Sequence, residues 1–138
     1  MAKLKFKAWS PKWKKMIFSN TRGYSIQIFG DGSARIWKGD SCDDKPVIMQ
    51  AVIGTRDKNG KQVFVSDVYR YVGGDCLYRV FYSDYYSMFM GKRIAVQISD
   101  DEYMKVSSDV ELTLNNGGRE IELVGNKYNL LIKIKNKV

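Results

Sequence analysis

The sequence predicts a mainly β protein, and three features of the chain support this fold class. Turn-forming glycine and asparagine residues recur at short intervals, and most segments between them alternate apolar and polar residues with the two-residue period of half-buried strands. No stretch shows the long apolar period of 3.6 residues that a helix packed on a core requires. The 138 residues, 44% of them hydrophobic, suffice for a core that needs neither disulfides nor metal.

Residues 1–45 are predicted to form an N-terminal subdomain of two β-hairpins. Its strands are expected at residues 4–8, 16–18, 24–28 and 34–38. Lysines alternate with apolar residues in the first strand, and the Gly-Asp-Gly-Ser turn at 30–33 tolerates the positive φ angles of a tight hairpin. The acidic, turn-rich stretch 39–46 marks the boundary with the rest of the chain.

Residues 46–138 are predicted to form a second β subdomain that packs against the first. Its strands are expected at residues 47–53, 63–65, 68–72, 77–82, 110–114, 121–123 and 132–134. Strong turn signals separate them, among them Asp-Lys-Asn-Gly at 57–60 and Asn-Asn-Gly-Gly at 115–118. Only residues 83–90 and 99–102 have any helical character, and both stretches are short.

Composition excludes several classes of protein. The chain has no histidine, the commonest general base and zinc ligand, and its two cysteines, Cys42 and Cys76, cannot complete a four-ligand zinc site. We therefore expect no metal, cofactor or catalytic residue. The N-terminus lacks the apolar run of a secretory signal, and no segment reaches the ~18 consecutive apolar residues of a membrane span. These features predict a cytoplasmic protein with reduced thiols and no membrane partner.

Three stretches of the sequence share motifs with a known protein family. KFKAW at residues 5–9 and KKMI at 14–17 match the family's opening, and ELVGNKY at 122–128 matches its closing segment. The most specific stretch is QAVIGTRDKNGKQVFVSDV at residues 50–68, which contains the Asp-Lys-Asn-Gly-Lys of the central signature. In this order, and over nearly the whole chain, the stretches resemble the YopX-like proteins of phages and prophages.

The resemblance implies a fold and an origin. It implies that the C-terminal part is a small Src-homology-type β-barrel. Because the boundary stretch 39–46 is short, we expect the N-terminal β-hairpin subdomain to pack on this barrel. The resemblance also implies a phage or prophage protein that resides in the cytoplasm of the bacterial host. It supplies no catalytic residue and no ligand. For Asp57, Asn59 and Asp67 in the signature, turn formation and the start of a strand explain the residue types better than a binding role does.

The first fifteen residues carry a one-sided basic ribbon without an acidic residue. It consists of Lys3, Lys5, Lys7, Lys12, Lys14 and Lys15, with Trp9 and Trp13 beside them. Such lysines can neutralise phosphates and the tryptophans can stack on unpaired bases, so these residues are a candidate nucleic-acid-binding surface. Lysines on an edge strand also prevent pairing between molecules, and this solvated-edge interpretation is favoured. The formal net charge of the whole chain is +8.

Aromatic and methionine residues crowd the middle of the chain between residues 69 and 90. A small β core cannot hold all of them, and tyrosine, phenylalanine and methionine are common at protein interfaces. The candidate partner interface consists of Tyr82, Tyr85, Tyr86 and Phe89, for self-association or for a host protein. A core supplemented by scattered surface tyrosines explains the same composition equally well.

The acidic residues Asp100, Asp101 and Glu102 suggest a metal-dependent nuclease, but three adjacent acids cannot all face one ion. A solvated loop is the favoured interpretation. We therefore expect a non-enzymatic phage accessory protein that binds macromolecules, as a homo-oligomer. Nucleic-acid binding through the lysines is the alternative, and a small metal-dependent hydrolase is a distant one.

Overall fold

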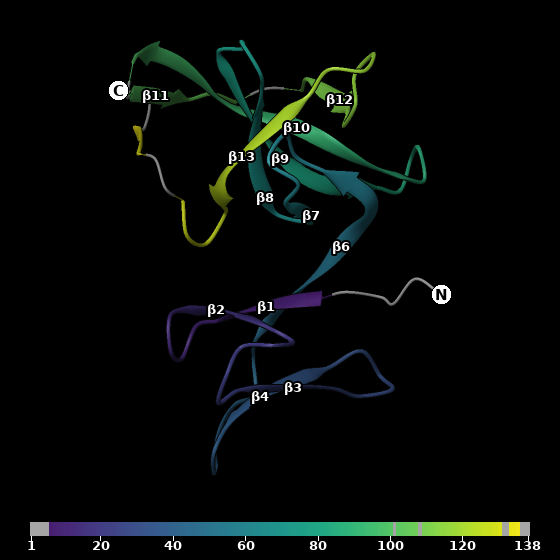
Figure 1. Cartoon of the computed structure of the whole chain (residues 1–138), viewed down its shortest axis with the longest axis vertical. Coiled ribbons are helices and arrows are strands. Elements are labelled where there is room, and N and C mark those ends of the chain that lie inside the picture. Colours follow the sequence, from purple (N-terminus) through teal and green to yellow (C-terminus); the bar gives the residue numbers. More distant parts are fainter. Residues whose placement is uncertain (1–5, 101, 108, 131–132, 136–138) are drawn as a thin grey trace. The chain divides into compact units, whose positions relative to one another are not determined.

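The computed structural model describes residues 6–100, 102–107, 109–130 and 133–135. The regular elements in these ranges are strands, which confirms the predicted mainly β class (Figure 1). The chain divides into two compact units, Met1–Ala51 (unit 1) and Val52–Val138 (unit 2). The division falls inside strand β6 (Val47–Arg56), a few residues beyond the sequence-based boundary. The described residues include no helical segment that could span a bilayer.

Unit 1 contains two small antiparallel sheets. Its strands are β1 (Phe6–Ser10), β2 (Lys15–Phe18), β3 (Ser25–Ile28), β4 (Ala34–Lys38), β5 (Ser41–Asp43) and the first half of β6. Strand β1 lies between β2 and β6, and β4 lies between β3 and β5. The β1–β2 and β3–β4 hairpins occur where the sequence predicts them, whereas β5 occupies part of the stretch expected to be only a turn.

A small apolar core and one buried carboxylate connect the two sheets of unit 1. The core consists of Ala8, Ile17 and Ile36, with Trp13, Tyr24, Ile26 and Ile48 packed against it. Asp43 Oδ2 accepts hydrogen bonds from Ser10 Oγ (2.6 Å) and the Lys12 amide (3.3 Å), and Oδ1 accepts one from the Lys45 amide (3.0 Å). Burial raises the pKa of Asp43, but these hydrogen bonds outweigh it and lower the pKa below its ordinary value. Asp43 therefore ties the β1–β2 turn to β5.

Unit 2 is built on a curled sheet in which β12 pairs with β10 beside the order β13-β8-β9-β10-β11-β14 (Figure 1). The strands of this sheet are β8 (Asp67–Tyr71), β9 (Cys76–Ser83), β10 (Met88–Ser99), β11 (Glu102–Lys105), β12 (Glu111–Thr113), β13 (Ile121–Asn126) and β14 (Ile134–Lys135). Strand β7 (Gln62–Phe64) also lies in unit 2 but pairs with β6. Strands β9 and β10 form its longest hairpin, paired from Cys76 with Val96 to Ser83 with Met88.

The helical character considered for residues 83–90 does not appear in the structure. These residues end β9, form the hairpin turn and begin β10. The buried Ser83 Oγ accepts a hydrogen bond from the Tyr86 amide (3.1 Å), and Ser87 has a φ of 53°, a left-handed conformation that a helix does not contain. The Ser83 hydrogen bond and the left-handed conformation of Ser87 therefore define the turn, and the aromatic side chains around it face outward.

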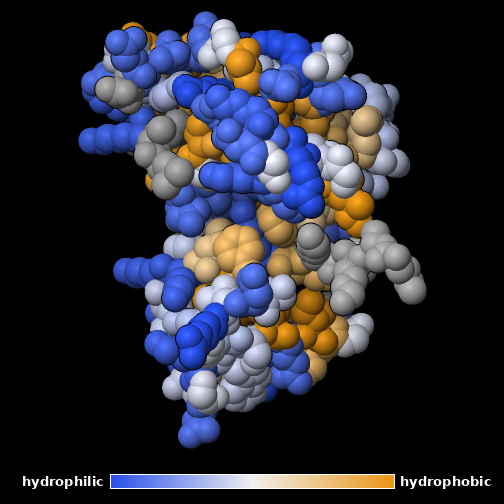
Figure 2. Space-filling view, in the orientation of Figure 1, coloured by the Kyte–Doolittle hydropathy of each residue, from blue (hydrophilic) through white to orange (hydrophobic). Residues whose placement is uncertain are grey.

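The main sheet of unit 2 buries side chains on both of its faces. One core cluster contains Val52, Val63, Tyr69, Tyr71, Tyr78, Val80, Leu114 and Ile121. The other contains Val68, Leu77, Ala95, Tyr103 and Val124. Consecutive residues of β8 point to opposite clusters, as expected for a strand covered on both sides. Figure 2 shows that hydrophilic side chains cover most of the drawn face of unit 2, with hydrophobic residues visible between them.

Three tyrosines form the centre of the first cluster. The ring of Tyr69 lies 5.5 Å from those of Tyr71 and Tyr78, centroid to centroid. The Tyr71 hydroxyl donates to the Thr113 carbonyl (2.9 Å), whereas the buried Tyr69 hydroxyl has no partner with hydrogen-bond geometry among the described residues. Burial, and secondarily the nearby Tyr71 hydroxyl, raise the pKa of Tyr69 far above its ordinary value. Tyr69 Oη faces Gly91 of β10, where there is no space for a side chain.

Candidate functional site

The structure changes the interpretation of the basic ribbon. Lys3 and Lys5 lie outside the described residues. Lys7 is only 7% exposed, so the expectation that it faces solvent is wrong. Its Nζ lies 5.9 Å from the ring centroid of Phe18, its cross-strand neighbour. Because β1 is paired on both sides, it is not the edge strand that the edge-protection interpretation assumed.

The ribbon lysines Lys12, Lys14 and Lys15 are exposed, and two of them lie close to aromatic rings. Lys12 Nζ lies 5.3 Å from the Trp13 ring, and Lys15 Nζ lies 4.8 Å from the Tyr24 ring. Lys38 was not among the residues predicted from the sequence, and its Nζ lies 5.5 Å from the centroid of the same Tyr24 ring. Lysine stems that lie over aromatic rings give weak cation–π contacts and occupy faces that bases would otherwise use.

The two tryptophans of the ribbon and Lys14 have different surroundings. Trp9 is half-buried within β1, paired with Met16 and Val47. Trp13 is half-buried and packs edge-on against Tyr24, with the ring centroids 5.8 Å apart. Lys14 is exposed at the β1–β2 turn with a φ of 51°. Within the described part of the ribbon, the candidate residues thus do not form one continuous basic and aromatic face.

The aromatic residues of the chain's middle divide into two sets. Tyr69, Tyr71 and Tyr78 are core residues, as described above. The four predicted interface residues Tyr82, Tyr85, Tyr86 and Phe89 gather at the end of the β9–β10 hairpin, and we call them the aromatic tip. The ring centroids of Tyr82 and Phe89 lie 5.1 Å apart across the hairpin, and those of Tyr85 and Tyr86 lie 4.8 Å apart within the turn. Tyr85 is 88% exposed.

A groove of about 430 Å³ adjoins the aromatic tip. Phe89 belongs to both, and Val52, Leu114 and Ile121 provide further apolar lining. Two arginines, Arg56 and Arg119, add positive charge to the lining. We call this the basic groove, and it was not predictable from the sequence because its walls come from segments up to 69 residues apart in the chain.

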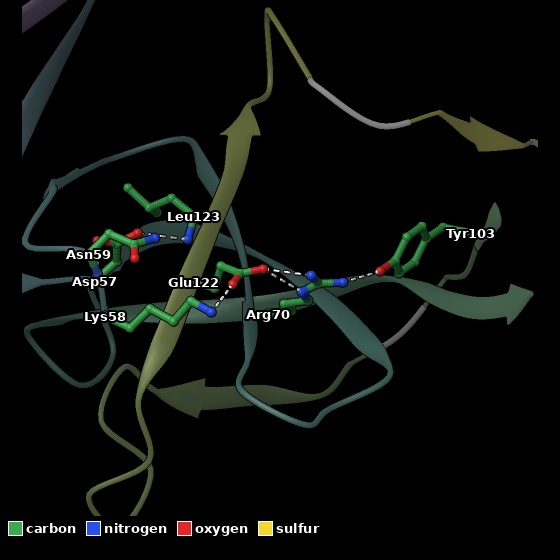
Figure 3. Close-up of polar contacts among 7 residues, drawn as sticks. All are labelled: Asp57, Lys58, Asn59, Arg70, Tyr103, Glu122 and Leu123. Atoms are coloured by element: carbon green, nitrogen blue, oxygen red, sulfur yellow. Dashed lines mark hydrogen bonds and ion pairs between the residues drawn. The ribbon is translucent and has the colours of Figure 1, made fainter. Parts of the chain in front are cut away.

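The signature residues beside the groove serve the fold. Asp57 Oδ1 accepts hydrogen bonds from the amides of Asn59 and Lys61 (both 2.9 Å), and Oδ2 accepts one from the Leu123 amide (3.2 Å; Figure 3). The buried Asp67 Oδ2 likewise accepts a hydrogen bond from the Phe64 amide (2.8 Å). Asp57 therefore joins the turn after β6 to β13, and its carboxylate oxygens are already occupied.

A charged network around Glu122 of β13 lies next to Asp57 (Figure 3). Glu122 Oε2 lies 2.5 Å from Lys58 Nζ, and Oε1 lies 2.6 Å from Arg70 Nη2. Arg70 Nη1 also donates to the Tyr103 hydroxyl (2.9 Å). Hydrogen bonds from Lys58 and then from Arg70 lower the pKa of Glu122 below its ordinary value. The network joins β8, β13 and β11 and consists of mutually satisfied groups.

The other reactive side chains do not assemble a centre within the described residues. Asp100 is exposed, Glu102 Oε1 lies 3.0 Å from Lys135 Nζ, and Asp101 lies outside the described part of the chain. Within that part, no three acidic, cysteine or histidine side chains come together to hold a metal ion. Cys42 and Cys76 are free and half-buried, and burial followed by the neighbouring Asp75 raises the pKa of Cys76.

The aromatic tip and the basic groove therefore form the most distinctive surface of unit 2. In unit 1, the most distinctive surface is formed by the exposed lysines beside Trp13 and Tyr24. No family model and no curated protein sequence matches the chain.

Proposed function

We propose that the protein is a non-enzymatic binding module that contacts macromolecules through the aromatic tip. One observation carries this proposal: three neighbouring tyrosines at one turn, Tyr82, Tyr85 and Tyr86, are 48%, 88% and 57% exposed. Tyrosine offers a large contact area with little loss of side-chain entropy, and its hydroxyl tolerates water until a partner binds. Gathered exposed aromatic residues are a feature of interaction sites, whereas single ones are ordinary on protein surfaces.

Self-association is the form of binding that we propose first. The same patch on two copies can meet around a two-fold axis. Each contact between two residues then occurs twice in the dimer, so even a small patch contributes two sets of contacts. The curled sheet of unit 2 supports a small Src-homology-type barrel as its finer description. The resemblance of residues 50–68 to the YopX-like signature supports a role as a phage or prophage accessory protein in the cytoplasm of the bacterial host.

Sedimentation velocity over a range of protein concentrations tests the proposal. We expect the wild-type protein to self-associate and the double variant Tyr85→Ser/Tyr86→Ser to remain monomeric under the same conditions. Val72→Ser is the matched control, because Val72 is half exposed in the turn at the opposite end of β9. A wild-type protein that stays monomeric at every concentration, or a double variant that associates like the wild type, would contradict self-association through the tip.

Nucleic-acid binding by unit 1 is the second candidate function. It is favoured by the exposed Lys12, Lys14 and Lys15 beside Trp13 and Tyr24, although Lys7 no longer belongs to this surface. Fluorescence anisotropy with labelled single-stranded and duplex DNA measures it directly. The triple variant Lys12→Glu/Lys14→Glu/Lys15→Glu should lose the binding, and the wild-type affinity should fall steeply with salt. Equal, negligible binding by both proteins at low salt would eliminate this function.

A further inference from the structure

The turn that presents the aromatic tip also carries a negative charge. Asp84 follows Ser83 and precedes Tyr85, and its side chain is exposed. Among the described residues, Asp84 makes no hydrogen bond or ion pair. The turn thus presents one carboxylate and two tyrosine rings side by side, with none of the three engaged by the rest of the described chain apart from the contact between the two rings.

The basic groove presents the complementary groups. Arg56 Nη1 donates to the Gly60 carbonyl (2.9 Å), and the Arg119 guanidinium lies 4.4 Å from the Tyr71 ring centroid. Neither arginine has a carboxylate partner among the described residues. Of the two acids that line the groove, Asp57 is occupied by backbone amides and Glu120 is exposed. Three cationic side chains, Arg56, Lys58 and Arg119, against these two carboxylates give the lining one excess positive charge beside its apolar residues. Lys58 is paired with Glu122, so the two arginines are the lining cations without a carboxylate partner among the described residues.

We propose that the aromatic tip of one copy docks in the basic groove of a second copy, and that the second tip docks reciprocally in the first groove. This inference rests on the proposed function, in which the tip is the contact surface. Asp84 of one copy meets Arg119 or Arg56 of the other, while Tyr85 and Tyr86 cover the apolar lining. Guanidinium groups bind carboxylates through paired hydrogen bonds and stack on aromatic rings, so the groove suits both kinds of group.

The positions of the two surfaces agree with a reciprocal contact. The tip does not fill the groove of its own chain, because Tyr85 is 88% exposed. Phe89 lines the groove and also packs on Tyr82, so the tip and the groove adjoin on one side of unit 2. Two adjoining complementary surfaces can both be satisfied by a single two-fold axis. The groove volume of about 430 Å³ lies within the range of about 300–1,000 Å³ typical of small-molecule pockets, so the groove is large enough to admit aromatic side chains.

A charge exchange between two variants tests the inference by sedimentation velocity. Asp84→Arg places an arginine opposite Arg119, and Arg119→Asp places an aspartate opposite Asp84. Each variant alone should therefore self-associate at least about tenfold more weakly than the wild type. An equimolar mixture should associate with nearly wild-type affinity. In the mixed dimer, the arginine introduced at position 84 meets the aspartate introduced at position 119, and the native Asp84 meets the native Arg119. Lys105→Asp, at the exposed last residue of β11, changes the net charge by the same −2 as Arg119→Asp and should associate like the wild type.

Two controls separate the failure of this inference from the failure of the proposed function. Circular dichroism verifies folding, and Arg56→Asp provides a groove variant that keeps the Arg119 contact with Tyr71 if Arg119→Asp unfolds. If the wild type and the groove variants associate equally while Tyr85→Ser/Tyr86→Ser does not, the tip contacts another surface and only this inference is overturned. A mixture that stays as weak as its components also overturns it. A monomeric wild type contradicts the proposed self-association itself.

Discussion

Replacing Gly91 with alanine should destabilise unit 2 severely, because the new methyl group would overlap the Tyr69 ring. A Cβ at position 91 would lie 1.8 Å from Tyr69 Oη and 2.7 Å from Cζ. Contacts of Cβ atoms shorter than 3.0 Å essentially do not occur, so the hydroxyl must move away by at least 1.2 Å. Tyr71 and Tyr78 pack against the same ring, and Tyr69 is fully buried, so the displacement must spread through the core.

The magnitude follows from the cost of overpacking. Extra methyl groups in a well-packed core cost about 1–3 kcal/mol, and occasionally more. The approach of 1.8 Å involves a stiff ring in a closed site, so we expect about 3 kcal/mol or more for Gly91→Ala. Tyr69→Phe removes the overlapping atom and an unpartnered hydroxyl, so this change alone should be nearly neutral. In the double variant Gly91→Ala/Tyr69→Phe, the closest contact becomes the 2.7 Å approach to Cζ, and part of the lost stability should return.

Urea unfolding followed by far-ultraviolet circular dichroism measures these changes. The three tryptophans, Trp9, Trp13 and Trp37, all lie in unit 1, so their fluorescence reports separately on the unit that does not contain Gly91. The control is Gly30→Ala, because a Cβ at Gly30 meets no atom within 4 Å and Gly30 does not have a positive φ. A loss below about 0.5 kcal/mol for Gly91→Ala, or the absence of any recovery with Tyr69→Phe, would refute the packing argument.

Two further predictions concern the polar contacts around β13. Asp57→Ala removes the acceptor of three backbone amides, including that of Leu123, and should lower the free energy of unfolding in urea by about 2 kcal/mol; an unchanged urea midpoint would contradict this role. Because Lys58 and Arg70 lower the pKa of Glu122, its contribution to stability is present above the unfolded pKa, near 4.5, and is lost as the pH falls through the lower folded value. Glu122→Gln should therefore differ most from the wild type near neutral pH, and urea midpoints that differ equally at about pH 7 and about pH 3 would refute the ion-pair argument.

The strands with clean alternation were predictable, whereas β10 was not. In Met88–Ser99, the longest strand, the pairing with β9 shifts between Arg93 and Ala95. Such a bulge changes which face each following side chain occupies and removes the period of two from the sequence. The segment also has apolar residues on both sides of the bulge, and a strand covered on both faces does not alternate. The position and length of β10 were therefore not predictable from a local sequence pattern.

The exposure of Lys7 and the position of the groove depend on contacts distant in sequence. Alternation correctly indicates a strand at β1, but it contains no information about β6, which pairs with β1 from some forty residues away. This second neighbour makes β1 a central strand. The aromatic tip was predictable as a set of residues because composition shows that a small core cannot hold them all. Which tyrosines would be exposed depended on the turn that Ser83 and Ser87 form.

The two half-buried cysteines give each unit one native attachment point for a spectroscopic label. Cys42 belongs to unit 1 and Cys76 to unit 2, and both thiols are free. A pair of spin labels on these thiols would report the distribution of distances between the units without any engineered cysteine. Because the raised pKa of Cys76 leaves less of it as the reactive thiolate, a mildly alkaline pH would speed its labelling, and the unfolded chain would react faster still.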